Sequence, residues 1–193
     1  MTLLQRLKLR SQPQSNSWLV VGLGNPGPNY AANRHNIGQT LLDVLAKKNS
    51  VSFRSHKSQA LVAEFQAQGK KIILAKSLGF MNLSGNPTKK LLDFYSIDPS
   101  HLIVVHDELD LEFGDIRKKF DGGHAGHNGL RDISAKCGTG YHRVRFGIGR
   151  PPGQMAVSDF VLQNFSTRES KELTVLIELG IDHVLEIISE KAI

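Results

Sequence analysis

The chain has 193 residues and carries 24 Lys and Arg against 18 Asp and Glu, a formal net charge of +6. This length suits one domain with a sizeable buried core. No apolar run approaches the roughly 18 residues that a membrane-spanning helix needs, and the single cysteine, Cys137, has no partner for an internal disulfide. We therefore expect a cytoplasmic protein from a reducing compartment, with no membrane partner.

Positive charge is concentrated in one part of the chain. Residues 117–145 hold seven Lys or Arg against two Asp, whereas residues 98–115 hold six acidic residues and no Lys or Arg. One basic surface opposite acidic ones is typical of a protein that binds a polyanion. Clustering in sequence need not mean clustering in space, so charges scattered over the surface are the alternative.

The first half of the chain predicts a strand, a helix and a hairpin. Residues 1–17 are basic and contain no acid, and we expect an arm outside a single domain of residues 18–193. The apolar residues 18–23 predict a buried strand that ends in a loop rich in Gly and Pro. Helical spacing of apolar residues predicts a helix over about 36–48, and alternation in 61–68 followed by 72–75 predicts a hairpin.

The second half interleaves further helices and strands. Asn86 and Pro87 suggest a helix start, with Asn as the cap. Strands are expected at 102–105, 116–120 and 142–148, and a short helix at 128–133. Ser166 and Glu169 form a capping box before a long C-terminal helix. We therefore predict the α/β class: a single domain with a twisted mixed β-sheet covered by helices on both faces.

A glycine motif follows the first strand. Gly22, Gly24 and Gly27 match the G-x-G-x-x-G pattern of dinucleotide-binding proteins, and a lone match of this kind is weak. In that pattern the helix opens at the third glycine, but here Pro26 and Pro28 keep the chain irregular until about residue 36. Dinucleotide binding is therefore disfavoured.

His35 and Asp107 are the strongest catalytic candidates. Asp107 ends a buried apolar strand, where an unpaired carboxylate would be costly. A proton donated by His35 to Asp107 would relieve that cost and leave the second ring nitrogen of His35 basic. The alternative for a lone His before a helix is a surface or capping role.

The nucleophile of such a site is expected to be water. The chain contains no Gly-x-Ser-x-Gly motif, so His35 would act on water directly. Asn25, Asn82 and Asn128 lie in separate glycine-containing loops, where their carboxamides could hold a substrate or an oxyanion. Their alternative role is turn formation, which Asn favours.

A metal site is the alternative for the same region. His124, His127, Asp121 and Asp107 are plausible ligands of a metal-dependent phosphoesterase, although their spacing matches no zinc pattern.

Several segments together resemble bacterial-type peptidyl-tRNA hydrolase. The matching stretches appear in the family's order from about Trp18 onward, and the segments are Val-Gly-Leu-Gly-Asn-Pro-Gly, Arg-His-Asn, Phe-Met-Asn-Leu-Ser-Gly, His-Asp-Glu-Leu-Asp, Gly-Gly-His-Ala-Gly-His-Asn-Gly and Arg-Val-Arg-Phe-Gly-Ile-Gly. The resemblance implies a monomeric enzyme without metal or cofactor. Its partner is peptidyl-tRNA, from which it cleaves the ester between the peptide and the terminal ribose, recycling tRNA from prematurely released peptidyl-tRNA.

The resemblance also assigns roles to individual residues. It implies that His35 is the base, that Asp107 supports it, and that Asn25 helps to distinguish a blocked from a free amino group. It implies contacts with the peptide or the acceptor end of tRNA at Tyr30, Phe80, Met81, Asn82, His127 and Asn128. The tRNA phosphates would be held by Arg117, Lys119, Arg143 and Arg145, in a salt-sensitive interaction.

Two departures from the family pattern affect the loops. Ser77, Leu78 and Gly79 stand where the family usually has a Pro and then a Thr beside the aromatic residue, and Ala125 stands where glycine is usual. The first departure puts the wall of the pocket in doubt. An RNA-binding module of the same fold without turnover is the alternative function, although binding alone would not require a base.

Overall fold

The computed structural model describes residues 16–190, which form one seven-stranded mixed sheet with the strand order β2-β3-β4-β1-β5-β7-β6. The central strands β4, β1, β5 and β7 are parallel, while β2, β3 and β6 run antiparallel to their neighbours. The strands are β1 (Ser17–Gly22), β2 (Arg54–His56), β3 (Ala60–Ala67), β4 (Lys70–Ser77), β5 (Leu102–Glu108), β6 (Ile116–Phe120) and β7 (His142–Gly147). This arrangement confirms the predicted fold class.

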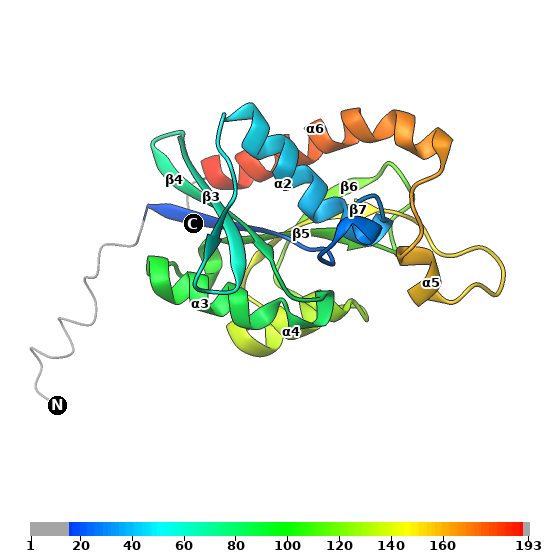
Figure 1. Ribbon diagram of the computed structural model, residues 1–193, viewed down its shortest axis with the longest axis horizontal. Coiled ribbons are helices and arrows are strands. Elements are labelled where there is room, and N and C mark those ends of the chain that lie inside the picture. Colours follow the sequence, from blue (N-terminus) through cyan, green and yellow to red (C-terminus); the bar gives the residue numbers. More distant parts are fainter. Residues whose placement is uncertain (1–15, 191–193) are drawn as a thin grey trace, which may run out of the picture.

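Helices cover both faces of the sheet (Figure 1). One face carries α2 (Ile37–Lys48) and α6 (Thr167–Ser189), and the other carries α3 (Gly85–Tyr95) and α4 (Asn128–Cys137). Each face has its own apolar cluster because alternate residues of a strand point to opposite sides. In β5, for example, Ile103 and Val105 pack on the α2 side while Leu102 and Val104 pack on the α3 side.

Two glycines let α2 cross close to the sheet. A Cβ on Gly22 would lie 2.4 Å from the carbonyl oxygen of Gly38, and a Cβ on Gly38 would lie 2.2 Å from that of Val105. The chain after β1 forms the short 3-10 helices η1 (Pro28–Tyr30) and η2 (Arg34–Asn36) before α2 begins at Ile37. The first glycine of the motif therefore serves helix–strand packing, and the helix opens too late to cradle a pyrophosphate.

Several boundaries differ from the predictions. The helix predicted to start at Asn86 starts at Gly85, whose N–H donates to Asp132 Oδ2 at 2.6 Å, so a carboxylate from α4 binds its first turn in place of an Asn cap. The edge strand β2 and the short helix α5 (Val157–Val161) were not predicted, because each is too short to show a period. The capping box of α6, at Ser166 and Glu169, is confirmed.

The N-terminal arm predicted over residues 1–17 lies outside the described residues except for its last two. Ser17 begins β1, and the side chain of Asn16 donates to the carbonyl oxygen of Gly69 at 2.9 Å. None of the helices among residues 16–190 has the length and apolar character that crossing a membrane requires.

Candidate active site

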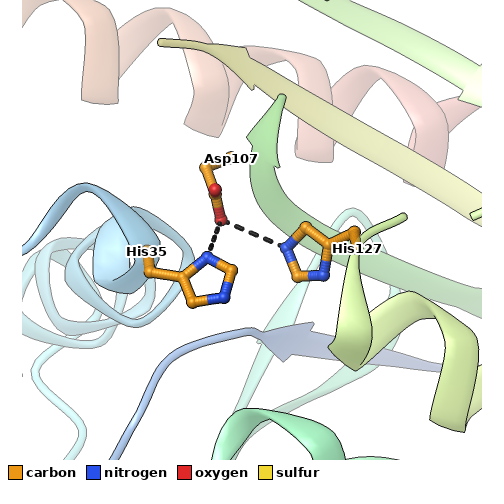
Figure 2. A group of neighbouring side chains, drawn as sticks. All are labelled: His35, Asp107 and His127. Carbon is orange, nitrogen blue, oxygen red and sulfur yellow. Dashed lines mark hydrogen bonds and ion pairs between the residues drawn. The ribbon is translucent and has the colours of Figure 1, made fainter. Parts of the chain in front are cut away.

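The structure brings His35 and Asp107 together at the carboxyl edge of the sheet. Asp107 lies near the end of β5 and is buried, and His35 lies in η2 directly before α2. His35 Nδ1 lies 2.8 Å from Asp107 Oδ1, and Figure 2 shows the ring of His35 on one side of the carboxylate and that of His127 on the other. His127 Nε2 lies 3.1 Å from the same oxygen.

The two histidines differ in which ring nitrogen is free. His127 is the N-cap of α4, and its Nδ1 accepts hydrogen bonds from the N–H groups of Gly129 and Leu130. Its proton must therefore sit on Nε2, which donates to Asp107, and both nitrogens are engaged. His35 donates from Nδ1 to Asp107, so its Nε2 keeps a lone pair. The geometry thus favours His35 over His127 as a base.

Burial and charge set the protonation of this cluster. Burial alone would lower the pKa of His35, but the charge and hydrogen bond of Asp107 outweigh it, so this pKa lies above its ordinary value. Burial would raise the pKa of Asp107, but the two imidazoles hold it well below its usual range. Burial, aided by His127, lowers the pKa of His106 to about 3, so His106 is neutral and donates from Nδ1 to the carbonyl oxygen of Asp107.

Asn25 is fixed by a second asparagine that sequence reasoning missed. The side chain of Asn36 accepts from the N–H of Asn25 and donates to its carbonyl oxygen, both at 2.9 Å. Asn25 Oδ1 accepts from the N–H of Met81 at 2.8 Å, so the Nδ2 amino group is what Asn25 can present to a ligand. The only signal for Asn36 in the sequence was its place beside His35.

A cavity of about 160 Å³ opens beside the pair. It is lined by His35 and Asp107, by His124 of the loop before α4 and Asn128 at the start of α4, and by Val157, Ser158 and Val161 of α5. Buried Arg34, next to His35, ties η2 to the chain after α5, because it donates to the carbonyl oxygen of Asn164 at 2.5 Å and pairs with Glu169 at 2.8 Å. The sequence did not predict α5 as a wall of this cavity, nor Arg34 as the residue that ties η2 to the chain after it.

The other predicted contacts lie in the loops around the same edge. Phe80 is 53% exposed and meets the half-buried Tyr30 edge to face, with ring centroids 6.2 Å apart. Asn82 and Asn128 are exposed, and Met81 is buried. Asn128 lines the cavity directly.

The predicted phosphate-binding residues separate into exposed and buried ones. Arg117 and Lys119 are exposed on β6, opposite Arg145 and Arg143 of β7 in the antiparallel register. Arg143 is 2% exposed, and its guanidinium donates to the carbonyl oxygens of Gly122 and Gly123. Its predicted role in phosphate binding is therefore corrected: Arg143 anchors the loop that holds Gly122 and Gly123 and precedes α4. Arg145 is half-buried, with its guanidinium 3.9 Å from the carboxylate of Glu108.

The metal cluster proposed from the sequence is not assembled. Over residues 16–190, the group with metal-ligand spacing is His35, Asp107 and His127, without His124 or Asp121. A metal on His127 Nε2 would require the ring proton to move to Nδ1, where the N–H groups of α4 already point. These residues fit a hydrogen-bonded triad better than a metal site.

We expect activity to be insensitive to chelation for this reason. Ester hydrolysis in the presence of EDTA should match the untreated rate, because the ring nitrogens that a metal would need carry the protons of the triad. Strong inhibition that zinc or manganese restores would contradict this assignment.

Comparisons with known proteins agree with the fold. Residues 19–193 match the family model described as peptidyl-tRNA hydrolase. The peptidyl-tRNA hydrolases of Leifsonia xyli and Frankia alni are each 53% identical to this chain, and the matches cover 90% of it and 91% and 88% of those proteins. The crystal structure of peptidyl-tRNA hydrolase from Acinetobacter baumannii is 34% identical, with a TM-score of 0.78 over 92% of this chain and 97% of that one.

The fold and these relatives define the class of protein as an α/β ester hydrolase. The chain belongs to the peptidyl-tRNA hydrolase family. It hydrolyses peptidyl-tRNA, and neither RNA binding without turnover nor phosphoester hydrolysis is favoured.

Proposed function

We propose that His35 is the general base of this hydrolysis and that Asp107 orients it. The observation that carries this proposal is the hydrogen-bond pattern of the triad. Asp107 accepts a hydrogen bond from each of the two histidines, and of these two only His35 retains a free ring nitrogen. The raised pKa of His35 makes that nitrogen a stronger base than an ordinary imidazole.

The reaction consumes one water, and His35 carries one of its protons to the leaving group. His35 Nε2 takes a proton from water while the water oxygen attacks the ester carbonyl carbon. The resulting oxyanion collapses and the bond to the 3′-oxygen of the terminal ribose breaks. The proton held by His35 passes to that oxygen, so the tRNA leaves with a free hydroxyl. The peptide leaves as a carboxylic acid, which loses the second proton of the water to solvent and becomes a carboxylate. Asp107 stabilises the transient imidazolium through its charge.

Asn25 supplies discrimination between blocked and free amino groups. Its Oδ1 is occupied by the N–H of Met81, so it offers the two N–H donors of Nδ2. A peptide or acetyl group has a carbonyl oxygen that can accept from Nδ2, whereas a free ammonium group has only donors. We therefore expect N-blocked aminoacyl-tRNA to be cleaved and free aminoacyl-tRNA to be spared.

The remaining predicted contacts form two groups, one for the peptide and the acceptor end and one for the phosphate backbone. We infer that Tyr30, Phe80, Met81, Asn82 and Asn128 contact the peptide or the acceptor end, and that Arg117, Lys119 and Arg145 contact the phosphate backbone. His127 lines the cavity and positions Asp107. The protein works as a cytoplasmic monomer without a cofactor and recycles tRNA from prematurely released peptidyl-tRNA.

The direct test is ester loss from N-acetyl-aminoacyl-tRNA, with unblocked aminoacyl-tRNA as the comparison. We expect cleavage of the first and survival of the second. Binding of tRNA without cleavage of either substrate would leave only an RNA-binding module.

Arg117 offers a test of the phosphate contacts. We expect Arg117→Ala to weaken tRNA binding and to lower the slope of log Kd against log salt by about one unit, if it neutralises one phosphate. Lys118→Ala is the matched control, because Lys118 lies on the same strand but points to the other face. There it pairs with Glu186 of α6 and with Glu190, the residue directly after α6. Equal slopes in Arg117→Ala and wild type would show that Arg117 does not contact a tRNA phosphate.

A further inference from the structure

The carboxyl edge of the sheet has a different chemistry on each side of His35 and Asp107. The central strands β1 and β5 lead to Asn25 and hold Asp107, whereas β6, at one end of the sheet, carries exposed Arg117 and Lys119. On the other side, β4 runs into a segment of exposed apolar residues: Leu78 is 46%, Phe80 53% and Leu83 55% exposed. A peptide esterified to a polyanion has the same two-part chemistry.

The apolar segment forms one side of a groove of about 360 Å³. The groove is lined by Gln59, Leu78, Gly79, Leu83, Asn86 and Pro87, and none of these side chains is charged or aromatic. Gly79 packs closely against Leu83, because a Cβ on Gly79 would lie 3.3 Å from the Cβ of Leu83. The groove is therefore built partly by Leu78 and Gly79, which depart from the usual family pattern.

The short segment 80–83 connects the groove to the active site along the chain. The N–H of Leu83 donates to the carbonyl oxygen of Phe80 at 2.8 Å. Met81, which follows Phe80, donates its N–H to Asn25 Oδ1. The ring of Phe80 meets Tyr30 at the same place. We expect a peptide whose C-terminal residue contacts Asn25 to extend along this segment, with a residue further from the ester at the groove.

We propose that this groove binds an apolar side chain of the peptide, at a residue N-terminal to the one esterified to tRNA. The lining favours peptide over RNA, because RNA binding draws on cations for phosphates and aromatic faces for bases, and the six lining residues supply neither. Burial of an apolar side chain against Leu78 and Leu83 would favour such substrates. The inference rests on the proposed placement of the ester beside His35.

The test compares kcat/KM for N-acetyl-peptidyl-tRNAs that end in glycine. Leucine or serine is placed at each of the two positions before that glycine, and N-acetyl-glycyl-tRNA is measured alongside. We expect leucine to be preferred over serine at one position by about three- to tenfold in kcat/KM. This ratio is at the low end of the selectivity of apolar pockets, because the groove is open. Leu83→Ser should bring this ratio close to one, and Leu83→Met should keep it.

Leu179→Ser is the matched control, because Leu179 is 41% exposed on α6 and should leave the ratio unchanged. Thermal unfolding of each variant checks that it is folded. Equal kcat/KM for leucine and serine at both positions would overturn the groove proposal while the hydrolase mechanism stood. Failure to cleave N-acetyl-glycyl-tRNA at all would instead count against the proposed mechanism.

Two measurements test whether the groove instead binds RNA or a second copy of the chain. Weaker binding of deacylated tRNA by Leu83→Ser would assign the groove to RNA, and a concentration-dependent dimer that Leu83→Ser abolishes would assign it to a second copy of the chain. Either result overturns the proposal.

Discussion

Replacing His35 by alanine should lower the rate of ester hydrolysis by about a hundredfold to ten-thousandfold, the usual contribution of a general base. The variant should still bind tRNA, since the exposed cations of β6 are untouched. Single-turnover cleavage of N-acetyl-aminoacyl-tRNA measures the first expectation and filter binding of deacylated tRNA measures the second.

Two further histidine variants make this test specific. His127→Asn keeps a side chain that can cap α4 and removes one of the two donors to Asp107, so we expect a smaller loss than for His35→Ala. His183→Ala removes a histidine that pairs with Glu186 on α6, away from the cavity, and should leave the rate unchanged. A near-normal rate in His35→Ala would show that His35 is not the base.

Replacing Asp107 by asparagine should have the second largest effect, about a hundredfold loss at neutral pH or more, because the imidazolium loses the charge that stabilises it. The hydrogen bonds can survive, since both histidines donate to one oxygen and asparagine retains one. The loss should therefore be electrostatic and should appear in the pH profile of the rate.

The direction of the pH shift follows from the pKa of His35. His35 is active when neutral, so the wild-type rate should rise with pH through a pKa above the ordinary value of 6.5. Without the charge of Asp107, burial dominates and lowers this pKa, so the acid limb of the profile should move to lower pH in Asp107→Asn. Asp110→Asn, which removes an exposed carboxylate paired with Arg150, should leave the limb in place. If the acid limb does not move in Asp107→Asn, Asp107 does not set the pKa of His35.

Much of the fold could be predicted from local patterns. Apolar runs gave the buried strands β1 and β5, alternation gave β3, and Ser166 with Glu169 gave the start of α6, because strand period and helix capping depend on residues close in sequence. The same reasoning identified Asp107 as costly to bury without a partner. It could not find β2 or α5, which are too short to show a period.

The chemistry of the candidate site depended on contacts that local patterns do not encode. The sequence offered eight histidines, and the tertiary structure set His35 and His127 against one carboxylate and engaged His127 at the start of α4. The sequence likewise offered a cluster of basic residues. The register of β6 and β7 left Arg117 and Lys119 exposed. The loop that holds Gly122 and Gly123 covers Arg143 and buries it. The sequence by itself determined the fold class and the catalytic candidates. Only the tertiary structure decided which nitrogen is free and which charges face solvent, because both depend on residues far apart in the chain.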